Sequence, residues 1–486
     1  MRFIWSFICV VLTGCMVGPD FHPPALPNTN SYTESPEPTK TIAIPAAKSG
    51  GKAQHFIACQ DIPAEWWHVF RSPELDNLIR AGLVNSPNLA AAKAVLMQAQ
   101  QNFKAQVGTA FFPALDATFI PERQRFSGTT FGDPRAVSLF NLFDATVNVS
   151  YTLDVFGGAR RGVEALCAQV NYEKFELEAA YLTLTANIVT TSITIASLRE
   201  QIQATHELIR AQANQVNIVI KQFNLGGASK ADVVLQQSQL GITQASLPPL
   251  EQTLAQSYHA LSVLIGELPC EDRLPKFNLD ALHLPTELPL SIPSLLVRKR
   301  PDIRASEALL HVASAQVGVA TANLYPQITI NGAYGWEGEV LSSLFNPLNK
   351  IWNIESTLTQ PLFQGGALFA KRCAAIAAFN QAAAQYRETV LHAFQNVADT
   401  LRALEHDAQE LKAQKYAEVA ARQSLYLTLS QYRLGGVSYL NLLVAQRSYQ
   451  QARIGAIQAQ AARYADTAAL FQALGGGWWN RRGYGC

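Results

Sequence analysis

The chain contains two copies of one sequence pattern, and this duplication constrains its fold more than any other feature. The segment Phe223–Ser229 (FNLGGAS) returns as Tyr432–Ser438 (YRLGGVS), at an offset of 209 residues. Three further matches occur in the same order at offsets between 207 and 214: Ser86–Leu89 with Arg300–Ile303, Phe111–Pro113 with Leu324–Pro326, and Phe156–Gly158 with Phe363–Gly366. Two repeats of about 200 residues indicate a duplicated half-structure and not a solenoid of many short units.

Each half is predicted to contain a pair of long strands. Residues Phe143–Val155 alternate without a break, with apolar side chains at odd positions and polar ones at even positions. Such a run exceeds the usual five or six residues of a soluble strand and is typical of a tilted strand with lipid on one face. A twisted pair of soluble hairpins is the alternative. Looser alternation precedes this strand at 115–126, and single apolar faces recur in the second half: Ile328, Ile330, Tyr334 and Trp336, then Trp352, Ile354, Leu358 and Leu362.

After each strand pair the apolar period changes from two to seven. Apolar residues recur every seventh position from Tyr181 to Phe223, and from Val390 to Tyr432 with one interruption at Glu418. A sustained seven-residue repeat is typical of coiled-coil-like packing. A helix of about 65 residues, at roughly 1.5 Å per residue, would extend about 100 Å. The Gly-Gly pairs should then end each long helix, and Pro248-Pro249 should bend or break the first returning helix.

These patterns give the predicted organisation of the chain. The segments are a signal peptide at 1–14, an N-terminal tether at 15–71, a first repeat at 72–286 with its strand pair at 114–156 and its hairpin helices at 159–267, a second repeat at 287–474 with its strand pair at 327–363 and its hairpin helices at 366–474, and a C-terminal tail at 475–486.

The first twenty residues predict the compartment. A basic start is followed by the apolar run Phe3–Leu12, which is too short to span a bilayer. The sequence Leu12-Thr13-Gly14-Cys15 resembles a bacterial lipobox, which is cleaved before the cysteine so that the thiol can carry diacylglycerol. Each buried acyl methylene contributes about 0.8 kcal/mol, so several chains anchor firmly. Met16 after the cysteine favours sorting to the outer membrane. An ordinary secretory signal with an incidental cysteine is the alternative.

Four strands per chain predict an assembly. An unclosed sheet in lipid leaves unpaired backbone groups that cost several kcal/mol each, and the smallest membrane barrels have about eight strands. Two chains would supply eight strands, which is too narrow for an open lumen, whereas three would supply twelve. Three chains would also contribute twelve long helix segments. We therefore predict an α+β membrane protein: a homotrimer with a 12-stranded outer-membrane β-barrel, continued by a long α-helical barrel in the periplasm.

The composition of the chain excludes several classes of protein. The 38 Lys and Arg nearly balance the 37 Asp and Glu, so the net charge of +1 gives no reason to expect nucleic acid as a partner. The 48% of apolar residues and the low charge content exclude disorder over most of the chain. A bundle of membrane helices is not expected either, because the sequence has no uninterrupted apolar run of about 18–20 residues.

The sequence contains no pattern typical of an enzyme. Its nine histidines are scattered, and neither a His-x-x-x-His pair, a Gly-x-Ser-x-Gly elbow nor a Walker loop occurs. The cysteines have no zinc or disulfide spacing and are interpreted as isolated small hydrophobic residues. We expect no catalysis, no cofactor and no metal site.

Several motifs together carry a family resemblance. They are Met16–Asp20 after the lipobox, Trp66-Trp67 with Ser72–Leu75, Arg298–Arg304, the two Leu-Gly-Gly turns and the closing Leu474–Trp478. Over residues 12–479 the chain resembles the outer-membrane efflux lipoproteins of the TolC/OprM/NodT family. The resemblance implies a trimeric barrel with a periplasmic tunnel, partnered by a periplasmic adaptor and an inner-membrane pump, that exports drugs, metals or other solutes. The outer channel of a type I protein secretion system and a lipid-anchored scaffold without a barrel are the alternatives.

The resemblance also implies roles for residues at the two helix tips. The adaptor-docking residues would be Phe223, Leu225, Gly226, Gly227, Tyr432, Leu434, Gly435 and Gly436. Paired glycines allow close backbone approach, although they can equally be simple helix caps.

A constriction is expected beside the tips. Asp232 matches an acidic position of the family's tip network, but it can equally be a solvated aspartate in the first turn of a helix. Relatives often carry carboxylates where this chain has Asn441 and Val444. Three symmetry-related carboxylates would attract cations into a narrow pore. The presence of Asn441 and Val444 in place of carboxylates therefore predicts a constriction that is less selective for cations.

Overall fold

The computed structural model describes residues 16–481, except 26, 28, 30, 37, 48, 128, 130, 131, 133–136 and 271–273. The predicted signal peptide, Cys15 and Cys486 lie outside the described residues. The chain forms two compact units, and each unit takes segments from both sequence repeats. The sheet unit comprises Met1–Pro24, Val95–Lys174 and Ala305–Arg387, and the helical unit comprises Ala25–Ala94, Phe175–Arg304 and Glu388–Cys486.

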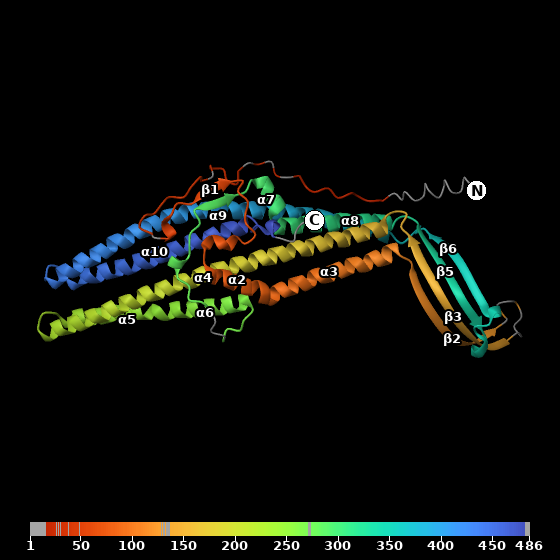
Figure 1. The fold of residues 1–486 in the computed structure, drawn as a ribbon, viewed down its shortest axis with the longest axis horizontal. Coiled ribbons are helices and arrows are strands. Elements are labelled where there is room, and N and C mark those ends of the chain that lie inside the picture. The colour runs from red at the N-terminus through yellow and green to blue at the C-terminus, as the bar shows by residue number, and fades with distance from the viewer. Residues whose placement is uncertain are drawn as a thin grey trace. The chain divides into compact units, whose positions relative to one another are not determined.

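A four-stranded antiparallel sheet dominates the sheet unit (Figure 1). Its strands, in spatial order, are β2 (Ala114–Ser127), β3 (Val137–Leu153), β5 (Gln327–Gly338) and β6 (Lys350–Thr359). Each repeat contributes one hairpin, and the pairing of β3 with β5 joins the two hairpins. The prediction of four long strands per chain is confirmed, with β3 reaching 17 residues. The strands β2 and β6 are the two edges of the sheet.

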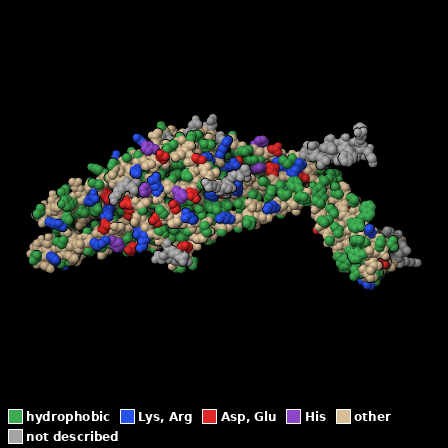
Figure 2. Space-filling model, viewed as in Figure 1, with side chains coloured by type: hydrophobic (Ala, Val, Ile, Leu, Met, Phe, Trp, Pro, Cys, Tyr) green, Lys and Arg blue, Asp and Glu red, His purple; other side chains and the backbone are tan. Residues whose placement is uncertain are grey.

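The register places most of the apolar positions of all four strands on one face. Val147 lies opposite Ala117 on one side and Tyr334 on the other, and Tyr334 lies opposite Trp352. The other face is polar: Thr118 Oγ1 lies 2.9 Å from Thr146 Oγ1. The apolar face is exposed in the single chain, with Trp352 70% accessible. Figure 2 shows hydrophobic side chains over much of the sheet. A soluble hairpin pair would have to leave this large apolar surface in water.

Two helices of 67 residues follow the strand pairs, α4 (Gly158–Asn224) and α9 (Ala367–Arg433). At about 1.5 Å per residue each is about 100 Å long, so the prediction from the seven-residue repeat is confirmed. One 18-residue stretch of α4 has a mean hydropathy of 1.3 and could cross a membrane by length and composition. One such stretch is weak evidence for a membrane span, and it does not contradict the prediction that the chain forms no bundle of membrane helices. Half of that stretch is buried within the protein, as in the core helix of a helical bundle.

The returning helices differ between the repeats, as the proline positions predict. In the first repeat α5 (Lys230–Ala245) stops, and α6 (Leu247–Ile265) begins after Ser246 with the prolines in its first turn. This placement is favourable because the first turn of a helix needs no backbone donors. In the second repeat α10 (Tyr439–Ala473) is continuous over 35 residues.

Shorter elements complete the two units. In the helical unit, Ser72 caps α2 by accepting a hydrogen bond from the backbone N–H of Leu75 at 3.4 Å, and a proline follows it. The remaining elements are η1 (Ser49–Gly51), β1 (His55–Ala58), η2 (Trp66–Phe70), α2 (Pro73–Asn85), α3 (Pro87–Phe111), η4 (Leu279–Ala281), β4 (Glu287–Leu290), α7 (Pro293–Lys299), α8 (Pro301–Ala322), η5 (Leu341–Ser343), η6 (Pro347–Asn349) and η7 (Trp478–Asn480). β1 pairs in parallel with β4.

The described cysteines are isolated residues. Cys59, Cys167, Cys270 and Cys373 are free, which agrees with the absence of a disulfide pattern. All four are exposed in the single chain, so these isolated residues do not belong to its core.

A buried arginine of α10 binds the N-terminal tether in the helical unit. Arg463 is fully buried and donates hydrogen bonds to the carbonyl oxygens of Gly50 and Lys52 and to Thr41 Oγ1, each at 2.8 Å. Burial lowers the pKa of Arg463 to about 10, so its guanidinium stays charged at neutral pH. The tether around residues 41–52 is therefore ordered by charge-assisted bonds from one side chain.

A carboxyl pair near this arginine predicts a pH-dependent stability. Burial, a hydrogen bond with Asp466 and its negative charge raise the pKa of Asp407 to about 8. Because the folded state holds a proton that the unfolded chain releases near pH 4, this group's contribution to stability falls as the pH rises from about 4 to 8. We expect the Asp407→Asn variant to lose this dependence and to melt at a higher temperature than the wild type at pH 8.

Thermal melts between pH 4 and pH 9 measure the effect. The matched control is Asp399→Asn, which replaces an exposed aspartate on the same helix α9. Identical pH profiles for the wild type and the Asp407→Asn variant would show that the two carboxyl groups do not share a proton.

Candidate functional site

The two helix tips end in the same turn. At the first tip the backbone N–H of Gly227 donates to the carbonyl oxygen of Gln222 at 2.7 Å, and at the second tip Gly436 donates to Gln431 at 2.9 Å. Gly226 and Gly435 have φ angles of +79° and +75°. This is the Schellman arrangement, in which a left-handed glycine ends a helix and the next residue bonds back across the last turn.

The structure separates the roles of the four tip glycines. Gly226 and Gly435 are needed for their positive φ angles. They are not needed for space, because a Cβ added at either would meet nothing within 4 Å. A Cβ at Gly227 would lie 3.6 Å from the Gln222 carbonyl oxygen, and one at Gly436 would lie 3.5 Å from that of Gln431. These are ordinary contacts. The helix-cap interpretation therefore holds for Gly226 and Gly435, whereas all four positions leave the turn surface open.

The most exposed apolar side chains of the tips are two leucines. Leu225 is 86% exposed and Leu434 is 88% exposed, and each precedes the glycine pair of its turn. Phe223 is partly exposed, and Lys230 Nζ lies 5.7 Å from the centre of its ring. Side chains this exposed contribute little packing within the chain, so their apolar surface is available to another protein.

A small apolar core holds the two tips of one chain together. It contains Val219 of α4, Val233 of α5, and Tyr439, Leu442 and Leu443 of α10. Tyr432 borders this core: its ring packs edge-on against that of Tyr439 at 5.8 Å, and its hydroxyl donates to Gln222 Oε1 at 3.1 Å. The two predicted tips are thus brought together. Tyr432 packs against their shared core and is also partly exposed at the tip surface.

Asp232 belongs to a helix cap. Its carboxylate accepts hydrogen bonds from the Ser229 backbone N–H at 2.9 Å and from Ser229 Oγ at 2.7 Å, while its own N–H donates to Ser229 Oγ at 3.1 Å. This reciprocal pattern is a capping box. The bonds from Ser229 lower the pKa of Asp232, so the group is ionised at neutral pH. Burial and this negative charge together raise the pKa of Tyr432.

Asn441 and Val444 occupy the same side of the first two turns of α10. Both are exposed, whereas Leu442 and Leu443 between them are buried in the tip core. By the offset of 209 residues, Asn441 corresponds to Asp232. The cap residue of α10, Ser438, has no side-chain capping bond. The second tip therefore differs from the first in lacking both a capping box and a carboxylate at this position.

Sequence reasoning missed a set of buried glutamines on the helices that form the tips. Gln212 of α4 and Gln236 of α5 are fully buried, and Gln446 of α10 is 6% exposed. Among the described residues, both amide atoms of Gln212 and the Oε1 atoms of Gln236 and Gln446 have no hydrogen-bond partner. A signal was present, because Gln212 lies three residues after the repeat position Ile209, where a coiled coil expects a second apolar residue.

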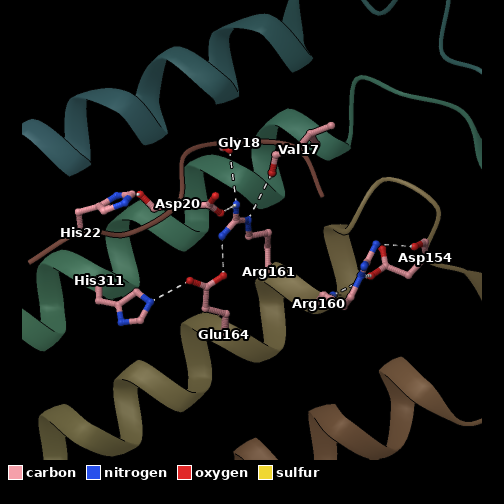
Figure 3. Close-up of polar contacts among 9 residues, drawn as sticks. All are labelled: Val17, Gly18, Asp20, His22, Asp154, Arg160, Arg161, Glu164 and His311. Atoms are coloured by element: carbon pink, nitrogen blue, oxygen red, sulfur yellow. Dashed lines mark hydrogen bonds and ion pairs between the residues drawn. The ribbon is translucent and has the colours of Figure 1, made fainter. Parts of the chain in front are cut away.

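A second cluster, in the sheet unit, holds the segment that follows Cys15 (Figure 3). Arg161 of α4 is 1% exposed and donates to the carbonyl oxygens of Val17 at 3.3 Å and Gly18 at 3.4 Å and to the Asp20 carboxylate at 2.7 Å. It also donates to Glu164 Oε2 at 2.7 Å. Burial lowers the pKa of Arg161, but the hydrogen bonds to Glu164 and Asp20 outweigh it and raise the pKa overall.

Helix α8 completes this cluster. Glu164 Oε1 lies 2.8 Å from His311 Nε2, and the ring of Phe21 stacks on the His311 ring at 4.2 Å. Gly18 has a φ of +94°, and a Cβ there would lie 2.5 Å from the Cα of Gly318. The motif Gly18-Pro19-Asp20 is thus a close backbone crossing over α8, and not simply the start of an extended tether.

The cluster fixes where the N-terminal segment leaves the sheet unit. The backbone N–H of Val17 donates to the carbonyl oxygen of Phe156 at 3.1 Å, three residues after the end of β3. Cys15 therefore precedes a segment that is bound at the end of the sheet where the helices begin.

The contacts of Arg161 predict that replacing this residue releases the N-terminal segment. We expect Arg161→Met to release residues 17–21, because one buried side chain supplies the hydrogen bonds to the Val17 and Gly18 carbonyl oxygens and to the Asp20 carboxylate. Breaking a fully buried ion pair costs about 3–5 kcal/mol, and less is expected here since Asp20 is largely exposed. Hydrogen exchange at the Val17 and Gly18 amides should become faster. Arg160→Met is the control, since Arg160 pairs with Asp154 at 3.1 Å instead. Unchanged exchange in the Arg161 variant would refute the anchoring role.

Comparison with known proteins connects these features. A family model described as "Outer membrane efflux protein" matches residues 78–267 and 292–476. The pyoverdine export outer membrane protein OpmQ of Pseudomonas aeruginosa is 31% identical over 426 residues, covering 86% of this chain and 88% of that protein. The probable efflux pump outer membrane protein TtgC of Pseudomonas putida is 28% identical over 477 residues, covering 97% and 95%.

Solved structures show the same fold. The outer-membrane channel OprN aligns with a TM-score of 0.85 at 24% identity, covering 96% of this chain and 100% of that one. The two stretches matched by the family model fall one in each repeat and span well over half of the chain. The chain belongs to the outer membrane efflux protein family, and is an efflux channel protein of the Gram-negative outer membrane.

Proposed function

We propose that three copies of this chain join through the strands β2 and β6 into one 12-stranded barrel. The observation that carries this proposal is a sheet with two free edges and one mostly apolar face. In lipid each unpaired edge would leave backbone groups unsatisfied, and closure across copies removes both edges. Twelve strands leave an aqueous lumen, which eight would not.

The polar face of the sheet would line that lumen. It carries a ladder of short polar side chains, including Ser150 Oγ, which donates to Asn331 Oδ1 at 2.8 Å, and Thr152 Oγ1, which lies 3.2 Å from Thr329 Oγ1. Such a lining lets polar solutes pass without strong binding. The channel would be a passive conduit without catalysis, with its energy supplied by an inner-membrane pump through a periplasmic adaptor.

The exposed leucines at the tips support docking to that adaptor. Fully burying a leucine stabilises a contact by about 1.5–3 kcal/mol, which corresponds to about tenfold or more in affinity. Leu225 and Leu434 precede turns whose glycines leave space on the surface, so a partner helix could pack closely against them. Asp232, Asn441 and Val444 would then lie at the constriction beside the docking surface.

The docking role is tested by the double variant Leu225→Ser/Leu434→Ser. We expect trimers to form normally, because neither side chain packs within the chain, while crosslinking to the adaptor and drug resistance fall at least tenfold. Leu268→Ser is the matched control, since this leucine is 65% exposed and lies outside the tips. Full resistance in the double variant, with adaptor crosslinking at the wild-type level, would exclude docking through these leucines.

Lipidation of Cys15 is proposed as the second attachment to the membrane. The cluster around Arg161 supports it, because it binds the following residues where the strands meet the helices. Acyl chains on Cys15 would then start near the periplasmic leaflet. Metabolic labelling with palmitate tests this proposal: label should enter the wild type and be absent from the Cys15→Ser variant, and label in that variant would contradict it.

A further inference from the structure

The charged side chains of the four strands are separated by face. The register places every carboxylate on the polar face, and among the strand residues that the structure describes these are Asp116, Glu122, Asp144, Glu337 and Glu355. The cations of the same strands, Arg123, Arg125 and Lys350, share the apolar face instead. A cation on a lipid-facing surface is unfavourable unless an anion or the headgroup region accommodates it.

The cations end the apolar bands of the two edge strands. In β2 the apolar face runs from Leu115 to Pro121 and the next position on that face is Arg123; in β6 it runs from Leu358 to Trp352 and the next position is Lys350. Both cations stand eight residues beyond the first leucine of their band. At about 3.3 Å per residue and a tilt of about 40°, each lies about 20 Å further along the barrel axis.

This end of the sheet is the one away from the helices. The strand β2 leaves α3 and runs toward Arg123, and β6 begins at Lys350 and runs toward α9. The N-terminal segment is bound at the opposite end, beside Phe156. In an outer-membrane barrel the three cations therefore face the outer leaflet.

Aromatic side chains mark the same depth. Lys350 Nζ lies 5.6 Å from the centre of the Tyr334 ring. That ring packs edge-on against Trp336 at 5.8 Å, and Trp336 packs edge-on against Phe345 at 5.3 Å. Aromatic girdles of membrane barrels lie where the hydrocarbon ends and the headgroups begin. The cations are thus placed at headgroup depth, and not in the hydrocarbon.

We propose that Arg123, Arg125 and Lys350 bind the phosphate groups of the phosphorylated glycolipid that forms the outer leaflet. All three side chains are exposed, and the apolar face of the described strands offers them no carboxylate. Guanidinium groups bind phosphate oxygens in a two-pronged geometry, and the adjoining apolar band accommodates acyl chains. The proposal rests on the closed barrel proposed above, in which Lys350 of one copy borders the strand that carries Arg123 and Arg125 in the next copy.

The test counts bound lipid on the full-length trimer. The protein is purified and incubated with bisphosphorylated lipid A or with the same lipid after enzymatic dephosphorylation, and native mass spectrometry measures the occupancy. We expect the wild type to retain the phosphorylated lipid at least tenfold better than the dephosphorylated one. The variant Arg123→Gln/Arg125→Gln/Lys350→Gln should lose that preference. The control Lys104→Gln/Arg387→Gln/Lys412→Gln removes three exposed cations from helices and should keep it.

The outcomes distinguish failure of the phosphate site from failure of the proposed barrel. Equal retention of both lipids by the wild type, or wild-type preference in the triple variant, would overturn the phosphate site. If the triple variant does not assemble, the charge-preserving variant Arg123→Lys/Arg125→Lys/Lys350→Arg must assemble and keep the preference, and failure of either would also overturn it. A wild type that forms no heat-modifiable trimer would refute the proposed barrel, which is a different result.

Discussion

Replacing the buried glutamines of the tip helices by leucine should stabilise the helical unit and impair export. In the triple variant Gln212→Leu/Gln236→Leu/Gln446→Leu, polar atoms that lack partners among the described residues are removed. Each buried unsatisfied polar group costs about 1–3 kcal/mol, so the expected gain is several kcal/mol. Since these side chains come from α4, α5 and α10, the gain would strengthen packing between the tip helices, and export would fall if it requires these helices to move apart.

The measurement combines thermal unfolding with drug accumulation. We expect the midpoint of the helical transition to rise by several degrees and export to fall, while the amount of trimer in the membrane stays unchanged. Gln239→Leu is the matched control, because this buried glutamine does have a partner: its Oε1 accepts a hydrogen bond from Arg447 Nε at 2.6 Å. Its loss should destabilise the protein. A shift in the same direction for both variants would show that the missing hydrogen bonds are not the cause.

Introducing carboxylates at the second tip should change which ions pass. In the variant Asn441→Asp/Val444→Asp each copy gains two negative charges on the exposed side of α10. Three copies would place six charges around a narrow opening, where a low effective dielectric makes each charge act strongly. We expect the ratio of potassium to chloride permeability in planar bilayers to rise severalfold, and the opposite variant Asn441→Lys to lower it.

The single variant Asn441→Asp has a further consequence within one chain. It restores at Ser438 the capping box that Ser229 and Asp232 form at the first tip, which stabilises the start of α10 by about 0.5–2 kcal/mol. The two effects can be separated, because Val444→Asp adds charge without a cap. Permeability ratios that stay at the wild-type value in all variants would show that Asn441 and Val444 do not line the constriction.

Much of the fold follows from periodicity. Alternation over residues 143–155 reports a strand with two different faces, and a seven-residue spacing from Tyr181 to Phe223 reports one helix face that stays in contact over its length. Both signals are local, so they place the strands and the long helices. Pro248-Pro249 likewise marks where the first returning helix is interrupted, since proline cannot donate in the helix interior.

The sites were predicted less completely, because they depend on contacts between distant segments. Nothing local to Arg161 indicates that it binds residues 17–20, more than 140 positions earlier. The same holds for Arg463 and the tether. For Asp232 the sequence left open a tip-network role and a solvated position in the first turn of a helix. The structure places it in that turn, bonded to Ser229 in a capping box, while a role across copies stays a prediction. The separation of charges by face needed the strand register, which alternation within one strand does not define.

Closure of several chains into one sealed barrel is the central requirement for this channel. The direct measurement is the mass of the purified, unboiled protein in detergent, followed by conductance of the same sample in a lipid bilayer. We predict the mass of three chains, a band that shifts to the monomer position on boiling, and discrete conductance steps. A monomer that stays in solution without detergent and forms no pore would contradict the account.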